Sequence, residues 1–532
     1  MTRHTPKLHR ASLVALACAL LAGCNLAPRY QTPALPVPDA VTPTLALPQS
    51  AAAASAGAVP LAQDGPMQWQ DFVQEPRLRE LVGMALANNR DLRMAVLAIE
   101  RARAQYGVTQ ADRFPTVNAA GAGSRARTAD DLTTAGRANT SGQYSATLGF
   151  SSYEIDFFGR VRNLNDAALQ EFFRVLENRR SVQLSLVAEV INAWLLIDAD
   201  ARRLQLARET LRTRQHALQL TRRAYELGAA SALVLAQAQS SADTARVDAA
   251  ALASQLARSR NALTLLAGAP VPDALLPGSV AATSIDMGTD TGVDAPNDTG
   301  ATASQGRAAV PALAAPAAPA TVLLGVPAHL PSSALLQRPD VRAAEHALQG
   351  ATANIGAARA AFFPSITLTA SVGTASNELS GLFGGGNGTW SFAPQIRLPI
   401  FDAGRNQSSL RVAETTQGTA VAQYEKTVQT AFREVADALA DRATLDERLA
   451  AQQSLVAATQ RTLELSDARY RLGADSYLAV LDAQRQLYAA QQAQITLQLA
   501  EQVNRVTLYK VLGGQWAADA AEAANASAPG GG

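Results

Sequence analysis

The chain has 532 residues, enough for several compact domains, and its 46 basic and 45 acidic residues leave a formal net charge of only +1. This balance excludes a large basic surface of the kind that binds nucleic acid. The two cysteines, Cys18 and Cys24, both lie near the N-terminus, so the sequence predicts no disulfide framework.

The first 23 residues have the pattern of a lipoprotein export signal. A positively charged start is followed by an apolar run at 11–21, which is too short to span a bilayer. The run ends in Leu21-Ala22-Gly23-Cys24, which resembles a bacterial lipobox. We therefore predict cleavage before Cys24 and covalent lipid on its thiol, with no other cofactor and no metal. An ordinary signal peptide with an incidental cysteine is the alternative. Asn25, in place of an Asp that would indicate inner-membrane retention, favours the outer membrane.

The segment from 24 to 67 is rich in proline and alanine, which predicts an extended tether between the lipid and the folded chain. Apolar residues then recur at helical spacing over 76–112, and Phe114-Pro115 ends this predicted helix. The folded part of the chain should therefore begin near residue 68.

Four later segments alternate apolar and polar residues, as half-buried β-strands do. They lie at about 115–125, 144–157, 364–375 and 390–401, and the first is the weakest because its residues are mostly small. Their order predicts two β-hairpins. Aromatic residues gather near the strand ends, as in the interfacial girdle of a membrane barrel. These residues are Phe114, Tyr153, Phe157, Phe158, Phe362, Phe363 and Phe401. A patch on a soluble β-sandwich is the alternative.

Each predicted hairpin is followed by an unusually long helical run. Proline is absent from 160–269 and 400–528, and glycine is absent from 160–227. Ala, Leu, Gln, Glu and Arg dominate, which is typical of coiled coils. The first helix of each run should cover roughly 65 residues, or about 100 Å. Gly228 and Gly473 each interrupt a run once, so each run should fold back as a helical hairpin with its tip at the glycine.

The two halves of the chain repeat each other. Gly159-Arg160 recurs 245 residues later as Gly404-Arg405. At the same distance, Tyr225-x-Leu227-Gly228 recurs as Tyr470-x-Leu472-Gly473. A duplication of this length predicts one architecture that is built twice.

The repeat also predicts the domain boundaries. The first copy should cover 68–270 and the second 337–515. Between them, 271–336 is rich in alanine and proline and has no periodicity, so it should be a partly disordered linker. The tail at 516–532 has the same character and should be disordered as well.

Four strands are too few to close a membrane barrel. An open sheet edge in lipid leaves backbone groups without hydrogen bonds, and bacterial barrels begin at 8 strands. The chain should therefore form oligomers. Two, three or four copies would give 8, 12 or 16 strands, and periodicity does not choose among these numbers.

Catalytic signatures are absent from the sequence. His216, His329 and His346 are scattered without metal-ligand spacing. No lysine follows a glycine, as a phosphate-binding loop requires, and there is no Gly-x-Ser-x-Gly nucleophile turn. We therefore predict that the chain is not an enzyme and has no nucleotide site.

Three motifs resemble signatures of the outer membrane factors of tripartite efflux systems, in the lipoprotein (NodT-type) branch of the TolC-like channels. They stand here as Tyr153-Glu154-Ile155-Asp156-Phe157-Phe158-Gly159-Arg160, Leu398-Pro399-Ile400-Phe401-Asp402-Ala403-Gly404-Arg405 and Leu335-Leu336-Gln337-Arg338-Pro339-Asp340-Val341-Arg342-Ala343-Ala344-Glu345. The resemblance covers about 68–515. It implies a mainly α fold with a membrane β-barrel, in which three chains supply 12 strands and their helices form a periplasmic tunnel.

The resemblance implies partners as well. A homotrimer in outer membrane lipid would receive cargo from a proton-driven resistance-nodulation-division transporter of the inner membrane. A periplasmic adaptor protein would connect the two, and the helical tips at Gly228 and Gly473 are where it would dock.

A gate near the second tip is also implied by the resemblance. Leu478, Asp482 and Arg485 match the residues that constrict the family's periplasmic aperture, and their spacing of i, i+4 and i+7 places them on one helix face. Without the resemblance, an ordinary solvated helix face would be the preferred interpretation. The first copy has Gln237 in place of Asp482, so only the second tip carries this charge.

The expected function is a passive, gated exit duct for drugs or other small toxic compounds, anchored in the outer membrane by lipid and extending into the periplasm. A structural coiled-coil lipoprotein is one alternative, although it does not explain four strands. A duct for copper or silver ions is another, which a total of only five Met residues argues weakly against. The sequence identifies neither the cargo nor the role of the unusually long insertion at 280–320.

Overall fold

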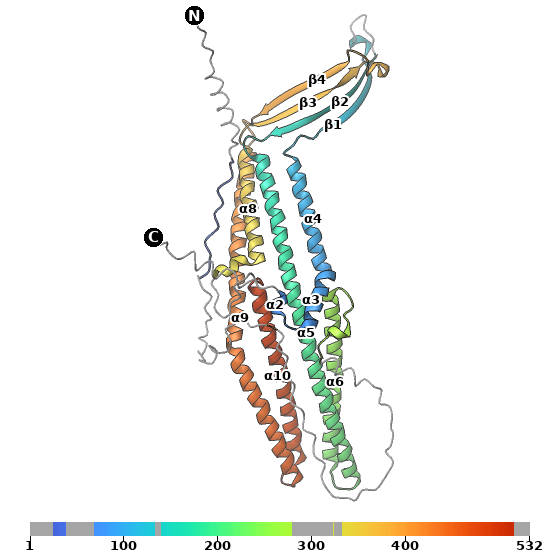
Figure 1. Cartoon of the computed structure of the whole chain (residues 1–532), viewed down its shortest axis with the longest axis vertical. Coiled ribbons are helices and arrows are strands. Elements are labelled where there is room, and N and C mark those ends of the chain that lie inside the picture. The colour runs from blue at the N-terminus through green and yellow to red at the C-terminus, as the bar shows by residue number, and fades with distance from the viewer. Residues whose placement is uncertain (1–24, 39–68, 133–139, 279–322, 324–331, 515–532) are drawn as a thin grey trace, which may run out of the picture. The chain divides into compact units, whose positions relative to one another are not determined.

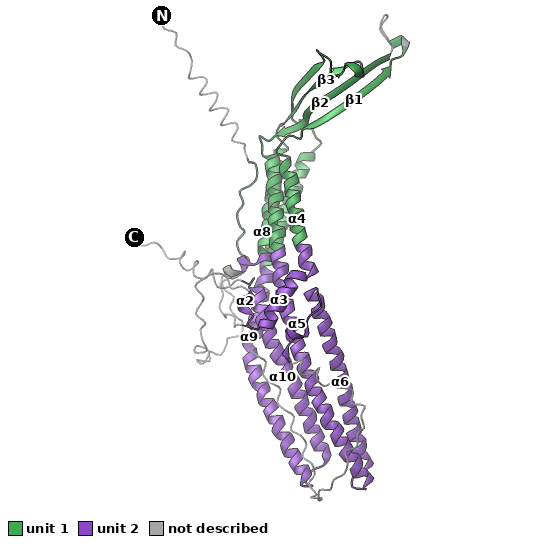
Figure 2. Cartoon of the chain, turned by 45° about the vertical axis from the view of Figure 1, so that its right-hand side comes forward, with its two compact units in different colours: residues 1–35, 96–178, 340–427 green, residues 36–95, 179–339, 428–532 purple. Residues whose placement is uncertain are grey.

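The computed structural model describes residues 25–38, 69–132, 140–278, 323 and 332–514. The predicted signal peptide, Cys24, most of the linker with its insertion at 280–320, and the tail at 516–532 lie outside the described residues. The chain divides into two compact units (Figure 2). Unit 1 contains 1–35, 96–178 and 340–427, and unit 2 contains 36–95, 179–339 and 428–532.

Unit 1 contains an antiparallel sheet of four described strands (Figure 1). The strands are β1 (Asn118–Arg127), β2 (Thr140–Ile155), β3 (Ser365–Ser376) and β4 (Gly388–Arg397), in the order β1-β2-β3-β4. Because β2 pairs with β3, for example Leu148 with Val372, the hairpins of the two repeats join into one sheet. Strands β1 and β4 form its edges.

Two strands end earlier than the alternation in the sequence suggested. β2 ends at Ile155 and not near 157, because the next residue, Asp156, accepts a hydrogen bond from the backbone N–H of Arg162 and caps the following helix. β4 ends at Arg397 and not near 401, where Leu398-Pro399 follows and proline has no N–H to donate to a ladder.

The two faces of the sheet differ in chemistry. One face carries apolar rows such as Leu148–Val372–Trp390, whose side chains are 51%, 60% and 80% exposed. The opposite face carries polar rows such as Glu154–Thr367–Gln395. Apolar residues outward and polar residues inward are the pattern of a membrane barrel with an aqueous lumen.

Helices make up most of the remaining described chain. In chain order they are α2 (Trp69–Phe72), α3 (Pro76–Asn88), α4 (Arg90–Ala111), α5 (Arg160–Glu226), α6 (Ala232–Ala267), α8 (Pro339–Ala360), α9 (Arg405–Arg471) and α10 (Tyr477–Val511). Short 3₁₀ helices lie at Asp130–Leu132, Asp273–Leu275, Ser332–Gln337 and Leu379–Gly381. Both α5 and α9 have 67 residues, close to the roughly 65 expected from their sequences.

Helix α5 is long and apolar enough, by length and composition alone, to cross a membrane. Half of its most apolar window is buried inside the structure, as expected of a helix in a protein core. Within α5, Val190, Ile191 and Ile197 are fully buried. We therefore assign the membrane-spanning role to the strands and not to α5.

The helix expected over 76–112 is interrupted at Asn89. The backbone there is extended, with φ −61° and ψ 133°, and it separates α3 from α4. The Asn89 side chain accepts a hydrogen bond from the Leu92 N–H at 2.9 Å and donates one to the Leu266 carbonyl at the end of α6, also at 2.9 Å. The asparagine therefore caps α4 and ties it to a partner 177 residues away, which periodicity does not reveal.

The N-terminal segment of unit 1 lies along α8. The Tyr30 hydroxyl donates to Glu345 at 3.0 Å, and the Leu26 carbonyl accepts from Arg359 at 3.4 Å. Between these contacts, Ala27 packs so closely on Gly356 that a Cβ there would lie 2.8 Å from the Ala27 Cα. Burial and the Glu345 carboxylate raise the pKa of Tyr30 to about 12. The segment therefore runs antiparallel to α8, and its N-terminal end lies at the end of α8 that leads to β3.

Glycine at two sheet positions provides a matched test of strand pairing. A Cβ at Gly149 would lie 2.3 Å from the Ala370 carbonyl oxygen of the neighbouring strand, whereas a Cβ at Gly121 would meet nothing within 4 Å. Gly149→Ala should therefore destabilise the sheet by about 2 kcal/mol or more, and Gly121→Ala should be tolerated. The fraction of protein that inserts into membranes as a heat-resistant form measures both. Equal insertion of the two variants would contradict the β2–β3 register.

Candidate functional site

The two helical tips share one backbone geometry. After α5, the N–H of Ala229 bonds to the Ala224 carbonyl and the N–H of Gly228 to the Tyr225 carbonyl. Ala474 and Gly473 repeat this arrangement after α9. These are Schellman caps, which need a left-handed residue, and the two glycines have φ of 74° and 78°.

An exposed leucine marks each tip. Leu227 and Leu472 occupy equivalent positions in the two repeats, and each is 84% exposed. Both glycines predicted as helical tips thus lie next to an exposed leucine.

The residues predicted to form the aperture lie on the first three turns of α10. Asp482 and Arg485 form an ion pair with each other, and their side chains are 49% and 63% exposed. Leu478, one turn earlier, is 45% exposed. The three side chains thus belong to a solvent-facing surface of the chain, and the charged pair is satisfied within one helix.

Two apolar clusters hold α10 in unit 2. Toward α9, Val480, Ala483 and Leu487 pack with Leu463. Toward α5, Ile495 packs with Ala199 and Leu206.

Helix α10 also carries a row of buried polar side chains. Gln484, Gln491 and Gln498 recur every seven residues and are only 5%, 1% and 8% exposed. Buried amides at heptad spacing fix the register of packed helices at some loss of stability.

Three arginines of α5 reach across to α10. Arg203 donates to the Thr496 hydroxyl at 3.0 Å, and Arg202 donates to the Gln498 side-chain carbonyl at 3.1 Å. Arg214 lies over the Tyr488 ring, 5.9 Å from its centroid. Each cation therefore meets an uncharged group on α10.

Two of these arginines also pair with carboxylates of α5, and the third bonds to α6. Arg202 pairs with Asp198 at 2.6 Å, and Arg203 pairs with the buried Asp200 at 3.0 Å. Arg214 donates to the Ser241 carbonyl of α6 at 3.2 Å.

The surroundings of Arg214 disfavour its charged form. Burial lowers the pKa of Arg214, and the positive charge of Arg485 lowers it further, while Tyr488 and Asp248 act in the opposite direction. Separation of α10 from α5 would break neutral contacts and would leave Asp198 with Arg202 and Asp200 with Arg203.

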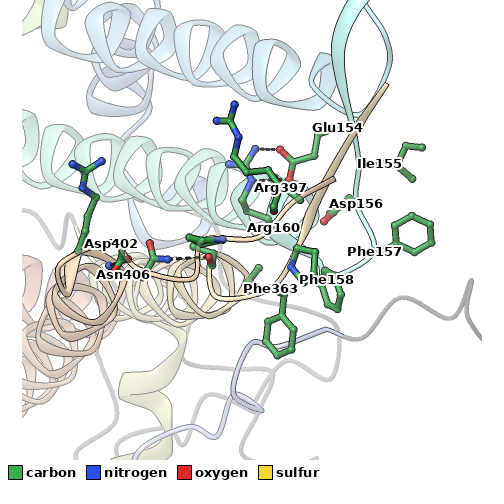
Figure 3. Close-up of a pocket in the computed structure, with 16 residues that line it drawn as sticks. Glu154, Ile155, Asp156, Phe157, Phe158, Arg160, Phe363, Arg397, Asp402 and Asn406 are labelled. Atoms are coloured by element: carbon green, nitrogen blue, oxygen red, sulfur yellow. Dashed lines mark hydrogen bonds and ion pairs between the residues drawn. The ribbon is translucent and has the colours of Figure 1, made fainter. Parts of the chain in front are cut away.

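The strand–helix junctions of unit 1 account for two of the sequence motifs (Figure 3). Glu154 accepts two hydrogen bonds from Arg160, at 2.8 and 2.6 Å, which fixes the end of β2 to the start of α5. Asp402 caps α9 by accepting from the Asn406 N–H at 2.9 Å, and this bond lowers the pKa of Asp402. A cavity of about 340 Å³ lies between the junctions, with Phe363 and Arg397 in its wall.

The third motif ties helices together in unit 2. Arg338 is 7% exposed, and it donates to the Val511 carbonyl of α10 and to Glu434 of α9, each at 2.8 Å. The arginine therefore secures the end of α10 that lies opposite the aperture residues.

Residues 81–269 and 330–514 match the model of the family described as "Outer membrane efflux protein". The chain belongs to this outer membrane efflux protein family. The two matched regions correspond to the two repeats, and the unmatched region between them coincides with most of the proline-rich linker.

Curated relatives of this efflux protein cover nearly its whole length. It is 43% identical to the "Toluene efflux pump outer membrane protein TtgC" of Pseudomonas putida over 513 residues, which is 95% of this chain and 96% of the relative. It is 40% identical to the "Cation efflux system protein CusC" of Escherichia coli O157:H7 over 498 residues, which is 93% of this chain and 96% of the relative.

Solved structures show the same fold. A membrane protein from Pseudomonas aeruginosa superposes with a TM-score of 0.78 at 38% identity, over 92% of this chain and all of that one. The open state of the MtrE outer membrane channel of Neisseria gonorrhoeae gives 0.72 at 34% identity, over 92% and 98%.

Family membership confirms three of the sequence-based predictions. The fold class is confirmed as mainly α with a membrane β-barrel in a duplicated architecture. The efflux protein is an outer membrane channel component of an efflux system, and it is located in the outer membrane and extends into the periplasm. Its relatives are efflux channels and not enzymes.

The sequence did not predict several contacts of this site. The α5 arginines that contact α10 belong to no sequence motif. Their partners are about 290 residues away in the sequence, so local patterns do not reveal these contacts. The seven-residue spacing of buried glutamines in α10 was available in the sequence as a signal. Cys24, the predicted lipidation site, lies outside the described residues.

Proposed function

We propose that three copies of this efflux protein form a passive, gated exit duct in a tripartite pump. The observation that carries the proposal is the four-stranded sheet with two free edges, because twelve strands from three copies would close it into a barrel. The chain would catalyse no reaction and would need no metal or cofactor apart from the lipid on Cys24. Energy would come from a proton-driven resistance-nodulation-division transporter in the inner membrane.

An adaptor protein in the periplasm would join the duct to that transporter. The tips at Gly228 and Gly473 support this assignment, because each presents one leucine that is 84% exposed. The two repeats offer the same backbone cap and the same apolar side chain, so one adaptor surface could recognise either tip.

The cargo would be amphiphilic organic compounds such as drugs and solvents. Relatives at 43% identity are named for toluene and antibiotic efflux. A duct for metal ions is the second candidate, because CusC relatives at 40% identity are named for cation efflux. The polar face of the sheet would line the lumen. Its rows at mid-height, such as Thr147–Gly373–Thr389, carry hydroxyl groups and no charged side chain. This lining favours organic cargo over metal ions.

Leu478, Asp482 and Arg485 would form the aperture of this duct. The ion pair of Asp482 with Arg485 on an exposed face of α10 supports this role, because three copies around an axis would form a charged constriction.

The double substitution Asp482→Ala with Arg485→Ala should widen the aperture. We expect the single-channel conductance in a planar bilayer to rise about twofold or more, because the constricting side chains are lost. Gln237→Ala, at the equivalent position of the first repeat, is the matched control and should leave the conductance unchanged. An unchanged conductance in the double variant would exclude these residues as the gate.

The contacts between α5 and α10 would hold the aperture closed. Arg202 and Arg203 hold α10 through hydrogen bonds to uncharged acceptors, and Arg214 lies over the Tyr488 ring. Each hydrogen bond to a charged group contributes about 1.5–3 kcal/mol. When α10 separates from α5, Asp198 and Asp200 keep their ion pairs with Arg202 and Arg203. The separation therefore avoids the larger cost of an unpaired buried charge. We call these contacts of the three arginines with α10 the latch. It would be stable at rest and could be released when a partner binds.

Strengthening this latch should keep the duct closed. Gln498→Glu preserves the shape of the acceptor and gives it a charge, so the contact to Arg202 should gain about 1 kcal/mol, or roughly fivefold in the closed-to-open equilibrium. We expect a lower open probability in bilayers, and Gln498→Leu should raise it. Ala493→Glu places the same charge at an exposed position of α10 as a control. Equal open probabilities for Gln498→Glu and Gln498→Leu would disprove the latch.

The lipid on Cys24 would anchor the chain at the foot of the barrel. In support, the N-terminal end of the segment lies on the strand side of α8, where the Leu26 carbonyl accepts a hydrogen bond from Arg359 of the last turn.

Labelled palmitate tests the anchor directly. Cells that express the protein should incorporate the label, and Cys24→Ser should abolish it. Cys18→Ser should retain full labelling, because Cys18 would be removed with the signal peptide. Label on the Cys24→Ser protein would refute this lipidation site.

A further inference from the structure

Two arginines lie on the apolar side of the sheet near the free end of the β1–β2 hairpin. Arg125 pairs with Gly142 and Arg127 with Thr140. Two residues closer to the helices along each strand, Gly123 pairs with Tyr144. Because side chains alternate along a strand, this series continues on one face to Leu148 and so to the row that contains Trp390. Both arginines therefore point to the lipid side of the barrel.

Strand geometry gives the height of Arg125 above the base of the apolar band. Ten residues of β3 separate Ile366 from Ser376, the partner of Tyr144, and two more residues of β2 lead to Gly142. Twelve residues span about 40 Å along a strand. With a tilt of about 40°, the height is about 30 Å, just above an apolar band of about 25 Å.

This height is where a charged side chain can face lipid. An arginine on the lipid side costs about 2–4 kcal/mol at mid-membrane and about 0–1 kcal/mol near an interface. All residues of β1 are exposed, and Arg125 makes no ion pair within the described part of the chain. Since the helices extend into the periplasm, the free end of the hairpin faces the outer leaflet.

We propose that Arg125 and Arg127 bind phosphate groups of the phosphorylated glycolipid that forms the outer leaflet. A guanidinium presents two parallel N–H donors that match a phosphate, and the lipid chains would continue along the apolar rows below. Two arginines at i and i+2 on one face can engage two phosphates of one lipid. The site would fix the depth of the barrel mouth in the membrane.

The proposal depends on the barrel faces and the outer-membrane location, and it is independent of the proposed aperture and latch. Arg397 provides an internal contrast within the same sheet. It pairs with Ser365 on the polar face, at the opposite end of the strands, and should not meet outer-leaflet lipid. A charge-neutral substitution there leaves the proposed site intact.

Native mass spectrometry of the purified full-length oligomer with added diphosphorylated lipid A tests the site. Arg125→Gln with Arg127→Gln should weaken binding about tenfold or more, and Arg397→Gln should not change it. Arg125→Lys with Arg127→Lys should bind at an intermediate level, because the charge stays while the paired donors are lost. All variants should keep the wild-type oligomer mass, which separates lost binding from lost folding.

Two results would overturn the proposal. One is unchanged lipid A binding in the double glutamine variant. The other is an equal loss of binding for phosphatidylglycerol and lipid A, which would indicate a general attraction for anionic lipid and no site for the outer-leaflet glycolipid. Retention of phosphatidylglycerol binding together with loss of lipid A binding supports the assignment.

Discussion

Backbone hydrogen bonding at the sheet edges is the constraint on which the rest of this molecule depends. Within one chain, β1 and β4 each pair on one side only, and lipid offers no substitute partner for the other side. Pairing with further copies satisfies both edges at once and separates an apolar outer face from a polar inner face. The long helices α5 and α9 follow β2 and β4 directly, so strand pairing between copies also determines where these helices begin.

Helix α10 makes apolar contacts with both of its neighbours in unit 2, and it adds polar contacts on the α5 side. Within the second hairpin, α9 and α10 share an apolar cluster around Leu463 and Leu487. Between hairpins, α5 contacts α10 through the apolar cluster of Ala199, Leu206 and Ile495 and also through arginines that donate to Gln498 and Thr496. Apolar packing is strong and hard to exchange, whereas hydrogen bonds to neutral groups are readily replaced by water. The polar contacts between α5 and α10 are therefore the ones that water can most readily replace.

Much of the fold could be predicted from the sequence because its signals are local. Alternation located the strands, the absence of proline and glycine located the long helices, and Gly228 and Gly473 located the tips through their left-handed backbone. Contacts between distant segments were not predictable in this way. The break at Asn89, the N-terminal segment on α8 and the α5 arginines all depend on tertiary partners. Leu478, Asp482 and Arg485 were named from family resemblance, and their role as an aperture remains a prediction.

The number of chains in the membrane-extracted assembly tests the central claim most directly. Native mass spectrometry in a mild detergent should give one species with three lipidated chains, each smaller than the 55.6 kDa of the full sequence because the signal peptide is lost. Three chains supply the twelve strands that satisfy every sheet edge. A conducting channel that contains a single chain would contradict the account, because one copy leaves both edges open in lipid.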